Sequence, residues 1–207
     1  MSKRTLDPQL KKKIYFAAGA AVILLLLILF LVFWNGGRLF YPTPTLTIET
    51  PQKISLSETE ELTLDVTISS LGDALYPAAS MSISFDPSRL EFLGLEEGNV
   101  FIRNDGDTPQ KLPDWSCNPA QCNQSGKINI MYLDTTGGKN AFTKEFLAQD
   151  DNVVLRLKFR PRGSLRSGDV CDLIFEDAVF AASDETQSLA MTRDTLKTRN
   201  GKIIVGE

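Results

Sequence analysis

Histidine is absent from the 207-residue chain. Without an imidazole, the chain has no serine–histidine or cysteine–histidine nucleophile pair, no histidine general base, and none of the zinc sites that use nitrogen ligands. These absences exclude most hydrolase chemistry. We therefore expect a protein that is not an enzyme and that holds no cofactor or metal.

Cysteine is scarce as well, with 3 residues in the chain. So few thiols cannot form the disulfide framework that holds many small extracellular domains together. Cys117 and Cys122 enclose a short segment whose Pro119 turn can bring the two sulfur atoms into bonding range, which makes a disulfide possible in an oxidising compartment. Cys171 lies in an apolar stretch and is expected to be a small buried side chain.

The chain does contain one long apolar segment. The 21 residues from Ile14 to Trp34 carry no charge, and a helix of about 20 such residues spans the hydrocarbon core of a bilayer. Five basic residues precede this segment and only Arg38 follows it closely, so the positive-inside rule places the N-terminus in the cytoplasm and the rest outside the cell. The competing interpretation is a cleaved signal peptide, but the small residues 17–21 open the run instead of closing it.

This reading divides the chain into four parts. They are a basic cytoplasmic tail (residues 1–13), a transmembrane anchor in the cell membrane (14–34), a linker rich in glycine and proline (35–45) and an extracellular domain (46–207). The part beyond residue 34 carries 17 basic and 25 acidic residues. Nucleic acid is excluded as a partner, because its phosphates require clustered lysine and arginine.

The external part shows a hydrophobic period of two, which is typical of strands with one buried and one wet face. Helical periodicity is weak, and only Phe142–Leu147 fits a single helical turn. Turn residues separate the strand-like runs, so we expect an all-β fold, a nine-stranded two-sheet β-sandwich behind one N-terminal transmembrane helix. The nine runs are Leu46–Ile48, Leu62–Ser69, Ser80–Phe85, Leu90–Leu95, Val100–Arg103, Ile128–Leu133, Leu155–Arg160, Leu173–Phe175 and Ile203–Val205.

Four segments of the chain, taken in order, resemble a cohesin module. They are Leu46–Ser69, Ser82–Phe92 with its Asp86-Pro87 turn, Gly126–Asp134, and the closing segments Phe175–Phe180 and Asn200–Val205. The resemblance implies a jelly-roll sandwich and a non-catalytic receptor for dockerin domains, in cellulosome-type assemblies that degrade polysaccharides. A membrane-anchored module of this kind would hold dockerin-bearing proteins at the cell surface.

The resemblance also implies that a dockerin lies across one sheet face. The strands concerned are those similar to Ser80–Phe85, Val100–Arg103, Lys127–Asp134 and Asp172–Phe175. Strand alternation then points a set of serine, asparagine and apolar side chains outward, and exposed apolar groups on one face are typical of an interface. The predicted partner-binding residues are Ser80, Ser82, Ser84, Asn129, Met131, Leu133 and Ile174.

Two observations leave this interpretation open. The apolar members of the set can instead be covered by the long segment Asn104–Ser125 or by a strand edge. In addition, many cohesins carry asparagine and aspartate where this chain has Ala78 and Ser80, so the polar clamp for the dockerin is missing. Either the partner is a dockerin of different specificity, or the module binds something else.

Other functions rest on weaker patterns. A carbohydrate-binding module would stack sugars on Trp115, Tyr76 or Tyr132, but alternation buries Tyr132 and no aromatic platform is evident. A structural or adhesive envelope subunit is the other alternative. Asn104–Asp107 resembles half of a calcium loop but has no closing glutamate, so a solvated turn is expected.

The acidic pairs Asp150-Asp151 and Glu176-Asp177 could suggest glycosidase carboxylates. Adjacent strand residues point to opposite faces and cannot address one sugar together. We therefore expect both pairs to be surface charge.

Overall fold

The computed structural model describes residues 8–34, 43–103, 110–137, 139–147, 152–183, 190–192 and 194–206. They belong to two compact units, Met1–Pro42 and Thr43–Glu207, and each unit is treated by itself below.

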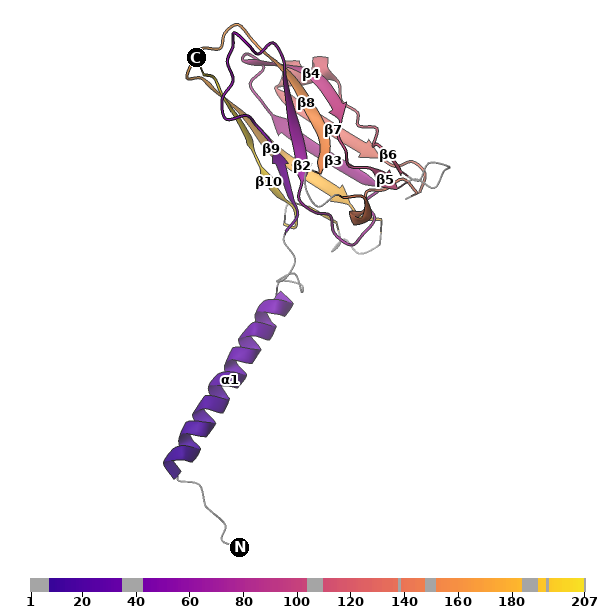
Figure 1. The fold of residues 1–207 in the computed structure, drawn as a ribbon. Coiled ribbons are helices and arrows are strands. Elements are labelled where there is room, and N and C mark those ends of the chain that lie inside the picture. The colour runs from indigo at the N-terminus through magenta and orange to yellow at the C-terminus, as the bar shows by residue number, and fades with distance from the viewer. Residues whose placement is uncertain are drawn as a thin grey trace. The chain divides into compact units, whose positions relative to one another are not determined.

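The first unit contains helix α1, Pro8–Trp34, a single uninterrupted helix (Figure 1). The side chains of residues 15–30 are all exposed within the chain itself. Over the residues that the structure describes, no helix combines the length and the apolar character that crossing a membrane requires.

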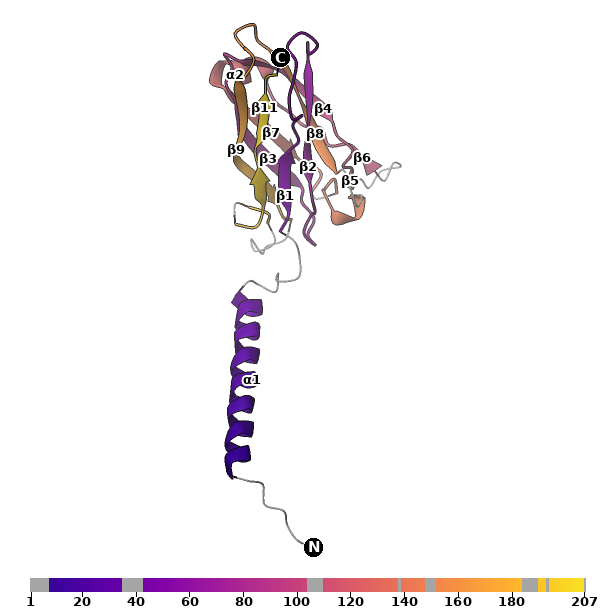
Figure 2. The ribbon, with the colours of Figure 1, turned by 60° about the vertical axis from the view of Figure 1, so that its left-hand side comes forward.

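The second unit is a two-layered sandwich (Figure 2). Nine strands among its described residues form the two layers, as the sequence predicts, and β5 (Ile102–Arg103) pairs with β6 (Gln110–Lys111) outside them. The five-stranded sheet has the order β10 (Lys197–Arg199), β1 (Thr45–Ile48), β2 (Leu62–Ile68), β8 (Val153–Pro161) and β4 (Leu90–Glu97). The four-stranded sheet has the order β11 (Gly201–Ile204), β9 (Val170–Ala181), β3 (Ala78–Ser84) and β7 (Lys127–Leu133).

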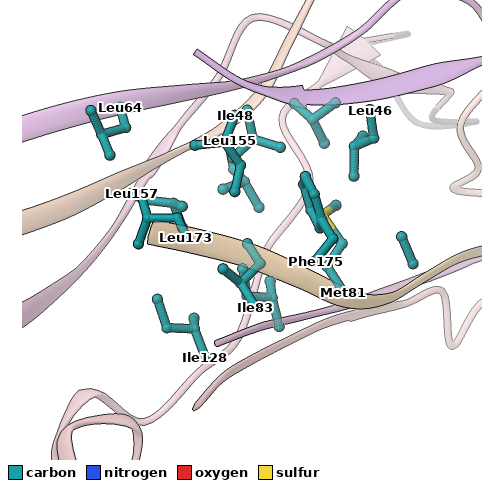
Figure 3. Close-up of a cluster of buried hydrophobic side chains, with 14 of the residues drawn as sticks. Leu46, Ile48, Leu64, Met81, Ile83, Ile128, Leu155, Leu157, Leu173 and Phe175 are labelled. Carbon is teal, nitrogen blue, oxygen red and sulfur yellow. The ribbon is translucent and has the colours of Figure 1, made fainter. Parts of the chain in front are cut away.

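The core lies between the two sheets and is built from the inward half of each alternating strand. Figure 3 shows these side chains converging from both layers: Leu46, Ile48, Leu64, Leu155 and Leu157 from the five-stranded sheet, and Met81, Ile83, Ile128, Leu173 and Phe175 from the other. Because successive residues of each strand point alternately into the core and outward, packing of the core does not determine the chemistry of the outward residues.

The nine strands are not quite the nine that the sequence predicts. The sequence analysis places Val100–Arg103 in the sheet of the predicted binding face, but among the described residues β5 pairs only with β6, so that prediction is wrong. The ninth place belongs to β10, which runs parallel to β1. Its three side chains are all exposed and show no alternation, so periodicity does not reveal the strand.

Two short helices complete the described fold. Helix α2, Pro119–Ser125, begins at the N-cap Asn118 and ends at Gly126, whose φ of 69° suits glycine. The side-chain amide of Asn123 holds α2 to β4, because it accepts from the Phe92 N–H and donates to the Phe92 carbonyl, both at 2.8 Å. The predicted turn at Phe142–Leu147 is reduced to a 3₁₀ helix, Lys144–Phe146.

Candidate functional site

The outer face of the four-stranded sheet carries all the predicted partner-binding residues. On β7 every second side chain is buried and those between are exposed, as the sequence alternation predicts. Ser80, Asn129, Met131, Leu133 and Ile174 are exposed, and Ser82 and Ser84 are half-buried. Their role in binding a partner stays a prediction, and we refer to this surface as the smooth face.

Strand register arranges the smooth face in four rows across β7, β3 and β9. Consecutive rows lie roughly 7 Å apart, the distance between residues i and i+2 of a strand. From one end to the other, the rows are Leu133–Ala78–Ala181, Met131–Ser80–Val179, Asn129–Ser82–Asp177 and Lys127–Ser84–Ile174.

The first two rows form an apolar end. Leu133 is 60% exposed and Met131 is 54% exposed, so more than half of each side chain remains open to solvent. The backbone of Ser116 does bridge the backbone of Met131, yet the Met131 side chain remains open. Ala181 and Val179 of β9 are half-buried and extend this apolar surface. The sequence analysis missed both residues, although alternation resumes after Asp177.

Ile174 does not belong to the apolar end. It is 44% exposed and lies in the fourth row, two rows beyond Met131. All three apolar side chains lie on the outer face of one sheet, as the sequence predicts, but the polar third row separates Ile174 from the other two. The strongly exposed residues of the apolar end are therefore Met131 and Leu133.

The third row is polar. The Ser82 hydroxyl donates a hydrogen bond of 2.9 Å to Oδ1 of Asn129. A shallow depression of about 470 Å³ lies along this row, and its lining includes Ser80, Asn129, Met131 and Asp177. Polar hydrogen-bonding groups thus stand directly beside the apolar end.

The acidic pair Glu176-Asp177 sits in a β-bulge. The register of β3 with β9 shifts here, so that Ser82 faces Asp177 while the next residue, Ile83, faces Phe175. Both acidic side chains are exposed, which contradicts the assumption that they point to opposite faces, because a bulge interrupts alternation. Glu176 is occupied by an ion pair with Lys127 at 2.8 Å.

The positions of the missing clamp lie within the apolar end. Ala78 pairs with Leu133, and Ser80 pairs with Met131. In these two rows, the Ser80 hydroxyl is the one outward polar side-chain group of β3. The next outward polar side chain of β3 is Ser82, in the third row.

The aromatic residues considered for sugar binding belong to the core. Tyr76 and Tyr132 are buried, and the indole N–H of Trp115 donates to the Val154 carbonyl at 3.2 Å. Trp115, Tyr132 and Phe142 pack with ring centroids 5.2–5.9 Å apart. Burial raises the pKa of Tyr132 to about 12, with a further contribution from Asp134 and Asp114. These three aromatic residues offer no stacking platform.

No disulfide joins Cys117 and Cys122, and all three cysteines are free thiols in the structure. The segment between Cys117 and Cys122 begins a helix instead of making a turn. Cys117 directly precedes the N-cap Asn118, and Cys122 is the fourth residue of α2. Side chains at these two positions commonly pack together as a hydrophobic staple. Burial, followed by the neighbouring Cys122, raises the pKa of the Cys117 thiol to about 11. Cys171 is buried, as expected.

The remaining sequence candidates give no site. Asn104–Asp107 and Asp150-Asp151 lie outside the described residues. Within the ranges that are described, no group of three or more metal-ligating side chains comes together.

Comparison with known proteins agrees with this architecture. The sequence profile of the Cohesin domain family matches residues 46–200, whereas no curated protein matches the chain. Among solved structures, the cohesin of the Coh-OlpA–Doc918 complex from Clostridium thermocellum is 17% identical, with a TM-score of 0.55 over 79% of this chain and 99% of that one.

Two further solved structures share the fold. The third ScaC cohesin of Acetivibrio cellulolyticus, in complex with the ScaB dockerin, is 14% identical with a TM-score of 0.55, over 79% of this chain and 99% of that chain. The cohesin module of a family 33 glycoside hydrolase from Clostridium perfringens is 14% identical with a TM-score of 0.50, over 80% and 98%. With the profile covering most of its length, the chain belongs to the cohesin domain family.

Proposed function

We propose that this cohesin module is a non-catalytic receptor that binds a dockerin domain on its smooth face. The observation that carries the proposal is the exposure of Met131 and Leu133, in neighbouring rows on the outer face of one sheet. Two of the similar solved structures are cohesin–dockerin complexes, which supports the same class of partner.

The energetics of the smooth face suit docking. Complete burial of a methionine or leucine side chain contributes about 1.5–3 kcal/mol. Because each side chain is a little more than half exposed, burying the exposed part contributes about 1 kcal/mol apiece. Ala78 and Ser80 are small, so they let a partner helix approach the sheet on β3, beside Leu133 and Met131. A well-packed centre of this kind is typical of interface hot spots.

The double substitution Met131→Asp with Leu133→Asp tests this proposal. Two carboxylates on the apolar end would have to be desolvated by the partner, so we expect dockerin binding to fall more than about 100-fold. Binding is measured by isothermal titration against a panel of dockerin modules from the genome that encodes the chain and from the complexes described above.

The matched control is Leu56→Asp, which places a carboxylate on an exposed apolar residue outside both sheets. The control should bind normally, and all variants should keep the thermal transition of the parent. Undiminished binding by the double variant would show that the smooth face is not the docking site. Glycan binding by a chain that binds no dockerin would favour the carbohydrate-binding alternative.

We also infer that residues 14–34 anchor the module in the cell membrane, with the N-terminus in the cytoplasm and the sandwich outside. The support comes from the sequence, because the uncharged run from Ile14 to Trp34 is long enough for a helix to span the hydrocarbon core of a bilayer. The basic residues before Ile14 support the orientation. A dockerin-bearing protein, such as a polysaccharide-degrading enzyme, would then be held at the cell surface.

Labelling of an introduced cysteine tests this topology, because the native Cys122 and Cys171 are buried. In a chain whose Cys117 is replaced by serine, Ser2→Cys marks the tail and Gln124→Cys marks an exposed position on α2. A membrane-impermeant maleimide added to intact cells should label only Gln124→Cys, and both positions should react after permeabilisation. Equal labelling in intact cells, or release of the chain from membranes by alkaline carbonate, would refute the anchor.

A further inference from the structure

The smooth face places its hydrogen-bonding groups one row away from the positions where many cohesins carry their clamp. Ala78 and Ser80 lie in the apolar rows, whereas the third row contains Asn129, Ser82 and Asp177. The spacing between the rows is roughly 7 Å, about the reach of one side chain. A partner that covers Met131 and Leu133 therefore meets the third row as its first polar contact.

Ser82 fixes the orientation of Asn129. Its hydroxyl donates to Oδ1 of Asn129 at 2.9 Å, which occupies the acceptor side of the amide. The Nδ2 group of the amide carries two donors, and no described residue of the chain accepts from it. Asn129 is exposed in the depression of about 470 Å³ beside Met131. The row thus offers oriented N–H donors next to the apolar end.

We propose that Asn129, held by Ser82, is the specificity-determining residue of the smooth face and reads a hydrogen-bond acceptor on the partner. The inference rests on the proposed docking function. The partner it fits is a dockerin helix whose apolar side chains cover Met131 and Leu133. One turn further along, this helix presents a carbonyl or hydroxyl oxygen to the Asn129 amide. The site thereby replaces the clamp that Ala78 and Ser80 do not supply.

Two substitutions at Asn129 distinguish a side chain that donates a hydrogen bond to the partner from one that only fills space in the interface. Asn129→Ala removes the hydrogen bond, and we expect dockerin binding about 10-fold weaker. Asn129→Asp keeps the shape and the bond from Ser82 but presents an acceptor and a charge to the partner's oxygen, so we expect binding about 100-fold weaker. Ser82→Ala leaves the amide in place without its support and should weaken binding about 3-fold.

Titration of the full chain in detergent micelles against the dockerin panel measures these effects. The matched control is Gln124→Glu, the same amide-to-carboxylate change on an exposed position of α2, which should bind as the parent does. Asn129→Asp binding as tightly as Asn129→Ala, or more tightly, would overturn the donor role.

The remaining outcomes separate this inference from the proposed function. A panel in which no dockerin binds the parent chain would remove both. Binding by the parent that neither change at Asn129 weakens would remove only the role of Asn129. A loss confined to Asp177→Asn would assign the specificity of the row to that carboxylate instead, and would equally overturn the role of Asn129.

Discussion

The two outer faces of the sandwich follow the same alternation but carry opposite chemistry. On the five-stranded sheet, Arg156 pairs with Asp65 at 2.9 Å, and Lys158 pairs with Glu96 at 3.0 Å and with Glu61 at 3.6 Å. Arg160 continues this ladder toward Glu61 at 2.8 Å. We call this surface the charged face. The smooth face instead leaves Met131 and Leu133 open to solvent at one end.

The difference explains which face suits a partner. A protein that covers the charged face must strip water from several ion pairs, and that desolvation cost offsets the gain from contact. On the smooth face, covering the apolar end removes hydrocarbon from water, which is favourable. The charged face is already satisfied by its own cross-strand pairs, whereas Met131 and Leu133 remain exposed on the smooth face.

The largest expected effect on stability comes from a substitution in the core beneath the smooth face. Phe142 is buried and packs against Trp115, Tyr132 and Phe180, directly under the apolar end. Phe142→Ala should lower the free energy of unfolding by about 3–5 kcal/mol, because it leaves a cavity among aromatic rings. Urea denaturation of the full chain in detergent micelles measures the loss, and the dockerin affinity of the folded fraction should fall with it.

Phe92→Ala is the matched control, since Phe92 is buried beneath the charged face and packs against Phe159. A similar loss of stability is expected there, with dockerin affinity unchanged. Equal weakening of binding by both variants would mean that the support under the apolar end has no special role in docking.

A smaller effect is expected on the charged face. Arg156 is partly exposed and bonds Asp65 and the Glu97 carbonyl. Arg156→Met should lower the free energy of unfolding by about 0.5–1 kcal/mol, since solvent screens such pairs. Dockerin binding should not change. Titration of the dockerin panel with this variant checks the point, and a large loss of affinity would make the charged face part of the docking site.

The sequence predicts most of this contrast, because strand parity is local. Alternation of Ile128, Ile130 and Tyr132 is enough to place Met131 and Leu133 outside. The bulge at Glu176-Asp177 is not predictable in this way, since it depends on the register between β3 and β9. Without the bulge, the separation of Ile174 from the apolar end cannot be inferred.

The misplaced elements also have physical reasons. Val100–Arg103 contains apolar residues, but nothing local decides whether such a short segment pairs with the sheet or with β6. Helix α2 has seven residues, too few for a periodic pattern, although Asn118 followed by Pro119 is a recognisable helix start. The possible disulfide between Cys117 and Cys122 depends on a turn at Pro119, but this residue opens α2 and both cysteines are free.

A smaller effect concerns pH. A hydrogen bond from Lys158 to Glu96, followed by the charge of Glu96, holds the pKa of Lys158 above its usual value. A pKa raised on folding contributes stability that is fully present below the unfolded pKa and is lost as pH rises through the folded pKa. The stability of the parent should therefore decline on the alkaline side. Lys158→Met should show a shallower decline in urea denaturation measured over a pH series.

The smooth face provides the comparison for this pH effect. Met131 and Leu133 do not titrate, so the double aspartate variant should follow the alkaline slope of the parent. A slope that is the same in the parent and in Lys158→Met would show that the ladder on the charged face makes no pH-dependent contribution.

The smallest expected effect tests the limit of the docking site within the smooth face itself. Ile174 is exposed but lies two rows beyond Met131, past the polar row. Two rows correspond to roughly 13 Å along the strand, so a helix centred on the apolar end does not need Ile174. Ile174→Asp should therefore change dockerin affinity less than about 3-fold, whereas Met131→Asp alone should cost about 10-fold or more. Equal losses at the two positions in parallel titrations would extend the site across all four rows, and the polar row would then lie at the centre of the interface instead of at its border.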